Sequence, residues 1–318
     1  MKDQFGRNIH YLRLSVTDRC NLRCRYCMPK EGIQKERHDE ILSFEEILQL
    51  VSLFVKAGID KIRLTGGEPL VRKKLPNLIE AINRENSIRD FSITTNGILL
   101  KHHAMEILDA GISRINISLD TMKAYKFREI AQIGDLKDVL EGIATVQSLG
   151  FKPIKINTVL IKGVNDDEIE DFINLTRHED LEVRFIELMP VGGNRGYSRT
   201  HFMPNTEVLK RCPDLIPISG TDKSSTASKY VIPGYRGRVG LISPNSHKFC
   251  GACNRVRLTA DGKMKTCLLS NEEVDLKSAL RRNVSVEELI RKNIFLKPGD
   301  HHLETGGFVT RNMSAIGG

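Results

Sequence analysis

The chain has 318 residues, 40% hydrophobic and 28% charged, which is long enough to bury a core in one large domain or two smaller ones. Its net charge of +8 indicates an anionic partner without choosing between nucleic acid, membrane surface and phosphorylated metabolite. No window approaches the ~20 apolar residues of a spanning helix, and the first residues lack a signal peptide's apolar core. We expect a cytoplasmic protein whose seven cysteines serve metal or redox chemistry rather than disulfides.

Apolar runs of strand length alternate with amphipathic helical stretches in the first part of the chain. Strands are predicted near 11–16, 60–65, 89–95, 113–119, 153–160 and 181–188, and helices over 43–57, 75–85, 102–110, 135–149 and 166–177. Ser43 and Glu46 match a capping box, and Gly58, Gly111 and Gly150 stand where helices should end. Repeated strand–helix units predict a parallel sheet, open or closed into a barrel.

The regular alternation breaks at PVGGNRGYSRT, directly after the last of these strands. It resumes irregularly with VIPGYRGRVGLI and a second group of cysteines. We therefore expect a barrel domain over 1–200 and a smaller C-terminal domain over 201–318.

Several predicted strands carry polar residues on one face and aliphatic residues on the other. The polar set comprises Arg13, Ser15, Thr17, Lys61, Arg63, Thr65, Ser92, Thr94, Asn96, Asn116, Ser118, Asp120, Lys155 and Asn157. Because side chains alternate across a strand, the aliphatic set can pack under the helices while the polar set lines a shared lumen. Four of the lumen residues are cations, and an unpaired buried charge is costly, so the pattern indicates a polyanionic ligand. The alternative is that carboxylates of the protein pair with these cations, and the set itself offers only Asp120.

Cys20, Cys24 and Cys27 are spaced C-x3-C-x2-C in the loop after the first predicted strand, at the strand ends where parallel-barrel enzymes build their sites. A [4Fe-4S] cluster held by three thiolates leaves one iron open to another ligand. A structural zinc site needs four ligands, and His38 is the nearest downstream histidine. The GGEP turn at 66–69 comes directly after the second predicted strand, and its glycines let backbone approach a ligand closely.

The second cysteine group, spaced C-x2-C-x13-C, comprises Cys250, Cys253 and Cys267. Zinc with a fourth ligand such as His247 is one interpretation of this group. Arg255 and Arg257 alternate onto one face between its cysteines, which is an anion-binding feature that structural zinc does not need. The seventh cysteine, Cys212, has no partner nearby in the sequence and is interpreted as an ordinary buried thiol.

The first cysteine motif, with the aromatic Tyr26 before its last cysteine, resembles the radical S-adenosylmethionine superfamily. A wider set of motifs resembles one family within it, the GTP 3′,8-cyclases of molybdenum-cofactor biosynthesis. These motifs are LRLSVTDRCNLRCRYCMP, KIRLTGGEPLVR, TTNG, RINISLD, KINTV, VRFIELMPVG, FCGACNRVRLTADGK and the closing IGG. They run through nearly the whole chain, which makes the resemblance far more specific than any single motif.

The resemblance implies a partial (β/α)6 barrel and a C-terminal region with a second [4Fe-4S] cluster. The first cysteine group would hold the cluster that binds S-adenosylmethionine, and the second group would hold a cluster whose open iron binds guanine. The residues implied around S-adenosylmethionine are Tyr26, Gly67, Glu68, Ser118, Asn157 and Met189. Those implied for GTP are Arg13, Lys61, Arg63, Thr94, Lys155, Arg255 and Arg257. Gly317 and Gly318 would reach into the active site and position the GTP-derived radical.

The activity implied is reductive cleavage of S-adenosylmethionine to a 5′-deoxyadenosyl radical, removal of hydrogen from ribose C3′ of GTP, and attack on guanine C8. The product would be (8S)-3′,8-cyclo-7,8-dihydroguanosine 5′-triphosphate. The implied partners are an electron donor and cyclic pyranopterin monophosphate synthase, which acts next, and a homodimer is one assembly that the resemblance allows. Neither nucleic acid nor a membrane is expected as a partner.

Two other functions compete with this one. A radical S-adenosylmethionine enzyme that modifies peptides would also carry auxiliary clusters, but it would usually hold more cysteines and leave Arg255 and Arg257 unexplained. A zinc-stabilised nucleic-acid-binding protein would use the positive charge, but it would favour stacking aromatics on a basic surface. Aromatic residues make up only 6% of this chain and tryptophan is absent, which disfavours the second alternative.

Overall fold

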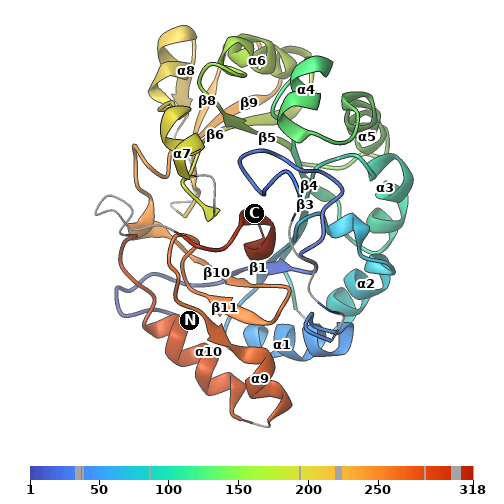
Figure 1. Cartoon of the computed structure of the whole chain (residues 1–318), viewed down its shortest axis with the longest axis vertical. Helices are drawn as coiled ribbons and strands as arrows, with labels where there is room; N and C mark the ends of the chain where they lie inside the picture. The colour runs from blue at the N-terminus through green and yellow to red at the C-terminus, as the bar shows by residue number, and fades with distance from the viewer. Residues whose placement is uncertain are drawn as a thin grey trace.

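The computed structural model describes residues 1–32, 37, 39–85, 87–192, 195–218, 224–282, 284–301 and 309–317. In these residues a curved sheet encloses a central space, and helices cover its outer side (Figure 1). The sheet has 12 strands in the order β12-β11-β10-β1-β2-β3-β4-β5-β6-β9-β8-β7. Strands β1 to β6 are parallel and adjacent in chain order, which gives the predicted partial barrel.

The elements of the barrel agree closely with the predicted alternation. Its strands are β1 (Tyr11–Ser15), β2 (Lys61–Thr65), β3 (Asp90–Thr95), β4 (Arg114–Ser118), β5 (Ile154–Leu160) and β6 (Leu181–Glu187). Its helices are α1 (Phe44–Lys56), α2 (Leu75–Glu85), α3 (Leu100–Asp109), α4 (Ala124–Ala131), α5 (Leu136–Ser148) and α6 (Ile169–His178). Helix α4 was not predicted, because no side chain caps its start and Gln132 replaces glycine at its left-handed end. Helix α6 begins later than predicted, after a 3₁₀ turn at Asp166–Glu168.

Local sequence signals place the ends of the helices. Ser43 Oγ accepts a hydrogen bond from Glu46 N at 3.2 Å, and the Glu46 carboxylate accepts one from Ser43 N at 2.9 Å, which completes the predicted capping box. Gly58, Gly111 and Gly150 have φ values of 96°, 104° and 77°, the left-handed region that glycine adopts without steric cost. The core lies between helices and sheet, and its fully buried strand residues include Leu12, Leu14, Ile62, Leu64, Ile93, Ile117 and Ile156.

The C-terminal part of the chain extends the same sheet at both edges. Its strands are β7 (Ile216–Ile218), β8 (Ala227–Val231), β9 (Arg238–Ile242), β10 (Arg255–Leu258), β11 (Lys263–Lys265) and β12 (Val274–Asp275). Its helices are α7 (Arg195–Thr200), α8 (Thr206–Arg211), α9 (Leu276–Arg281), α10 (Val286–Phe295) and α11 (Met313–Ile316). Strand β9 pairs in parallel with β6, and β10 pairs in parallel with β1. The division into two domains near residue 200 stays a prediction.

Helix α11, dark red in Figure 1, lies inside the curve of the sheet rather than on its outer side. Among the described residues, no helix has the length and apolar character needed to cross a membrane.

Candidate active site

A cavity of about 470 Å³ lies in the space that the curved sheet encloses. Every predicted site residue except the two C-terminal glycines contributes to its lining, including all six cysteines of the two groups. Ten of the fourteen predicted lumen residues line it, and the remaining four, Ser15, Thr17, Ser92 and Asn116, are at most 4% exposed. The polar faces of the strands therefore converge on one site, as the alternating pattern predicted.

Strand pairing arranges the basic residues of the cavity in two rows. In the first row, Tyr11 of β1 lies between Arg255 of β10 and Lys61 of β2. In the second row, Arg13 lies between Arg257 and Arg63 on the same strands. The sequence placed Arg255 and Arg257 on one face, but the pairing of β10 with β1 is what brings them beside the barrel cations.

Carboxylates neutralise some of these cations. Lys61 Nζ lies 2.7 Å from Asp90 Oδ2, and Lys155 Nζ lies 3.9 Å from Glu182 Oε2. Asp90 and Glu182 lie at the starts of β3 and β6 and do not belong to the predicted polar set, in which Asp120 is the one carboxylate. The structure also adds Arg184, whose Nε lies 2.5 Å from Glu182 Oε1. Carboxylates of the protein therefore pair with some of the lumen cations, as the alternative interpretation of the polar set expected.

The cavity nevertheless favours an anion. Burial and the nearby Arg184 charge lower the pKa of Lys155 to about 7. Burial and the neighbouring Arg255 lower the pKa of Arg257 to about 10. Burial, together with the smaller effect of the Arg257 charge, also lowers the pKa of Arg13 well below its usual value. An anionic ligand would relieve both the burial of these cations and their mutual repulsion.

Tyr11 is a cavity residue that sequence reasoning missed. Its ring face lies 4.9 Å from Lys61 Nζ, 5.6 Å from Arg63 Cζ and 5.8 Å from Arg255 Cζ. Such cation–π contacts hold neighbouring cations in place at a modest gain in free energy. The available signal was its position two residues before Arg13, on the same face of the strand.

The first cysteine group lies in the loop after β1. Burial raises the pKa of Cys27 to about 12, and it raises the pKa of Cys20 and of Cys24 as well. Three neutral thiols close together suit a site in which iron replaces their protons, because metal binding deprotonates cysteine. The hydroxyl of Tyr26, a residue of this loop, donates to Asp120 Oδ2 at 2.7 Å, which ties the loop to the segment after β4.

The GGEP turn packs tightly between the first loop and β3. A Cβ atom on Gly67 would overlap the carbonyl oxygen of Arg19, so only glycine fits there. Glu68 Oε1 accepts a hydrogen bond from Thr95 Oγ1 at 2.8 Å, and its Oε2 accepts one from Asn96 N at 2.7 Å. Burial raises the pKa of Glu68 to about 7. Glu68 thus fastens the turn to the end of β3, and its predicted contact with S-adenosylmethionine stays a prediction.

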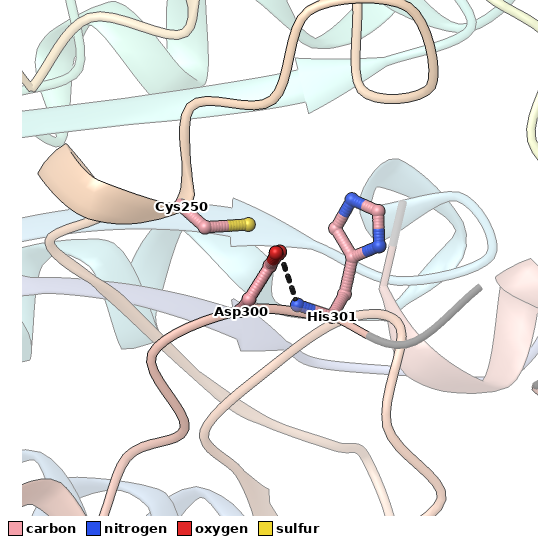
Figure 2. A group of neighbouring side chains, drawn as sticks. All are labelled: Cys250, Asp300 and His301. Carbon is pink, nitrogen blue, oxygen red and sulfur yellow. Dashed lines mark hydrogen bonds between the residues drawn. The ribbon is translucent and has the colours of Figure 1, made fainter. Parts of the chain in front are cut away.

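The second cysteine group faces the same cavity, and Figure 2 shows the surroundings of Cys250. Its sulfur, a carboxylate oxygen of Asp300 and a ring nitrogen of His301 lie within 4.8 Å of one another. Burial and the hydrogen bond with Asp300 raise the pKa of Cys250 to about 11. His301 was not predicted, because only the fold brings it here, whereas the expected alternative ligand His247 is exposed.

The C-terminal tail enters the cavity region from helix α11. The Gly317 carbonyl oxygen accepts a hydrogen bond from Arg257 Nη1 at 2.5 Å. Gly317 has a φ of 85°, and a Cβ atom there would overlap Thr65 Oγ1 and lie 3.0 Å from Ser15 Cβ. Glycine is therefore the residue that this backbone position accepts. Gly318 lies outside the described residues.

A parallel barrel whose first loop carries C-x3-C-x2-C and whose second carries GGEP defines the radical S-adenosylmethionine class of fold. The model of the Radical SAM superfamily matches residues 14–176, and that of Molybdenum Cofactor Synthesis C matches 181–303. Among solved structures, Streptococcus suis SuiB bound to S-adenosylmethionine has a TM-score of 0.54 at 14% identity, covering 97% of this chain and 77% of that chain. This likeness shows the fold alone.

Relatives at higher identity define the family. The GTP 3′,8-cyclase of Peptoclostridium acidaminophilum is 51% identical over 317 residues, which cover 99% of this chain and 98% of the relative. That of Alkaliphilus oremlandii (strain OhILAs) is 50% identical over 321 residues, with 100% of both chains covered. The chain belongs to the GTP 3′,8-cyclase family of radical S-adenosylmethionine enzymes. Membership of this family argues against both alternative functions, the modification of peptides and the binding of nucleic acid.

Proposed function

We propose that this chain cyclises GTP to (8S)-3′,8-cyclo-7,8-dihydroguanosine 5′-triphosphate, the first step of molybdenum-cofactor biosynthesis. One observation carries the proposal: two rows of cations lie in a single cavity that also contains both cysteine groups. The cavity can therefore hold a nucleotide triphosphate between two iron–sulfur sites. Family membership supplies the identity of the nucleotide.

The first cysteine group fits a [4Fe-4S] cluster, since its three partly buried thiols would leave one iron for a small-molecule ligand. When bound, this cluster and S-adenosylmethionine supply the 5′-deoxyadenosyl radical that removes hydrogen from ribose C3′. The protein orients the cosubstrate and excludes water. Tyr26 belongs to the cysteine loop and Gly67 packs against its start, and Ser118, Asn157 and Met189 also line the cavity. The buried Oδ1 of Asn157 has no hydrogen-bond partner in the described ranges, so it can accept a bond from the cosubstrate.

The basic rows bind the triphosphate. Arginine guanidinium groups make bidentate contacts with phosphate oxygens that lysine cannot reproduce. Arg13, Arg63 and Arg257 supply such groups in one row, and Lys61 lies in the other. Lys155 on β5 and Thr94 on β3 line the same cavity. Together these residues hold GTP so that its ribose faces the first cysteine group.

In this proposal Cys250, Cys253 and Cys267 would hold a second [4Fe-4S] cluster, which would supply an open iron for the guanine. These three cysteines line the same cavity as Arg255 and Arg257, which can orient the base and phosphates. Zinc held by Cys250, Asp300 and His301 is the competing occupant. Iron and sulfide analysis of anaerobically purified protein distinguishes the two: roughly eight irons per chain support two clusters, whereas about four irons with one zinc refute the second.

The proposed reaction also implies partners. Cleavage of S-adenosylmethionine is reductive, so an electron donor is required. The cyclised nucleotide is then the substrate of cyclic pyranopterin monophosphate synthase, and a homodimer is one assembly that family membership allows.

The function is tested by product analysis. Anaerobic protein with reconstituted clusters is incubated with GTP, S-adenosylmethionine and a reductant, and nucleotides are separated and identified by mass and NMR. We expect a 3′,8-cyclised triphosphate formed in step with 5′-deoxyadenosine. Formation of 5′-deoxyadenosine without any cyclised nucleotide from fully loaded protein would contradict the proposed function.

A further inference from the structure

The segment before β1 folds against the second cysteine group, although the two are far apart in the sequence. Gln4 N donates to the carbonyl oxygen of Phe295, at the end of α10, at 3.0 Å. The side chain of Arg7 is only 5% exposed. No motif in the sequence drew attention to this arginine, and the proposed function assigns it no role.

The Arg7 guanidinium joins two backbone segments. Its Nη1 donates to the carbonyl oxygens of Cys250 at 2.8 Å and Gly299 at 3.3 Å. Its Nη2 donates to those of Pro298 at 2.8 Å and Lys297 at 3.2 Å. One planar group therefore binds the turn that begins the second cysteine group and the segment 297–299. A lysine could not do this, because its ammonium is a compact group without the planar fork of donors that reaches several carbonyls at once.

Asp3 holds this guanidinium in place. Its Oδ2 accepts a hydrogen bond from Arg7 Nε at 2.6 Å, and its Oδ1 accepts one from Arg7 N at 2.9 Å. The Asp3 side chain is fully buried, and the Phe5 ring lies 5.2 Å from the guanidinium carbon. A buried ion pair is costly to desolvate and adds little net stability. The remaining donors of the guanidinium are directed to carbonyls around Cys250, which indicates a role in shaping that site.

The segment 297–299 leads directly into Asp300 and His301. The side chains of these two residues lie beside the Cys250 sulfur in Figure 2. The Asp300 carboxylate also accepts a hydrogen bond from Lys248 Nζ at 2.9 Å. Because Arg7 binds the carbonyls of 297–299 and that of Cys250 together, it sets the distance between the Cys250 sulfur and the side chains of Asp300 and His301.

We propose that Arg7, held by Asp3, is a positioning residue of the second cluster: it ties the Cys250 turn to 297–299 and is needed for that cluster and not for the first. The inference rests on the proposed second cluster. The first cysteine group lies in the loop after β1 and is not among the groups that the Arg7 side chain contacts. The two clusters in one chain therefore provide an internal control.

The test compares Arg7→Gln, Arg7→Lys and Asp3→Asn with Arg291→Gln. Arg291 is a matched control because it also donates to a backbone carbonyl, that of Lys56, and to a carboxylate, but it is exposed and is not among the residues that line the cavity with both cysteine groups. Iron per chain is measured in each holoenzyme. The change in the electron paramagnetic resonance spectrum on adding S-adenosylmethionine reports the first cluster, and the change on adding GTP reports the second.

In Arg7→Gln we expect iron per chain to fall to about half of the wild-type value. The response to S-adenosylmethionine should be kept, while the response to GTP should be lost. Arg7→Lys should behave in the same way, because it keeps the charge and loses the planar group. Asp3→Asn should keep both clusters but lose iron from the second to a chelator severalfold faster than wild type, and Arg291→Gln should match wild type.

Proportional loss of both clusters in Arg7→Gln and in Asp3→Asn would assign Arg7 to general folding and overturn the inference. A wild-type response to GTP in Arg7→Gln or Arg7→Lys would overturn it too. Wild-type protein that itself holds no second cluster would instead refute the proposed second cluster, so the two failures are distinguishable.

Discussion

Binding of GTP should take up a proton at Lys155. Burial and the Arg184 charge lower the pKa of Lys155 to about 7, so at pH 8 only about one molecule in ten of the free protein carries the charge. A triphosphate beside Nζ favours the ammonium and raises the pKa. The pKa of Lys155 is lower in the free protein than in the GTP complex. The contribution of Lys155 to GTP affinity is therefore full below pH 7, and it decreases as the pH rises from 7 toward the pKa of Lys155 in the complex. The decrease approaches tenfold per pH unit.

Calorimetry in buffers of different ionisation enthalpy measures this uptake directly. At pH 8 the wild type should take up close to one proton per GTP, and Lys155→Met should take up none beyond that due to the nucleotide. Subtracting the variant removes the nucleotide's own ionisation, since its terminal phosphate titrates near pH 6. At pH 6.5 the variant should bind GTP about ten- to a hundredfold more weakly, the equivalent of roughly 1.5–3 kcal/mol for a hydrogen bond to a charged group. Identical proton uptake and pH dependence in both proteins would refute the reasoning.

Substitutions in the cysteine groups, the basic rows and the tail should have separable effects. Serine in place of any cysteine of the first group should abolish cleavage of S-adenosylmethionine, whereas serine in the second group should leave uncoupled cleavage without cyclised nucleotide. Liquid chromatography measures 5′-deoxyadenosine and the cyclised nucleotide in each variant. Normal cyclised product from any of these variants would contradict the assignment of the cysteines. Arg63→Ala should weaken GTP binding about ten- to a hundredfold by calorimetry with iron content unchanged; unchanged affinity would count against the basic rows. Removing Gly317 and Gly318 should keep iron and cleavage while suppressing cyclisation, and a wild-type cyclisation rate would show that the tail is dispensable.

Local patterns predicted the barrel well because its elements are defined by residues close in sequence. The period-2 alternation in β1, β2, β4 and β5 placed the lumen face, and the capping box at Ser43 placed the start of α1. Helix α4 carries neither a side-chain cap nor a terminal glycine, so it gave no comparable signal. The register of neighbouring parallel strands is then set by burial of the aliphatic face.

Contacts between distant segments could not be predicted in this way. The pairing of β10 with β1 joins residues more than two hundred positions apart, and no periodicity specifies it. The same limit hid the ion pairs of Asp90 and Glu182 with lumen lysines, because each carboxylate lies at the start of another strand. His301 and Arg7 reach the second cysteine group only through tertiary packing.

The central claim is that the C3′ hydrogen of bound GTP is the atom removed. GTP carrying deuterium at C3′ is incubated with fully loaded protein, S-adenosylmethionine and a reductant, and the isotopic mass of the 5′-deoxyadenosine is measured together with the cyclised nucleotide. The account predicts one deuterium in the 5′-deoxyadenosine and none at C3′ of the cyclised product. Unlabelled 5′-deoxyadenosine formed alongside nucleotide that retains its deuterium would contradict it.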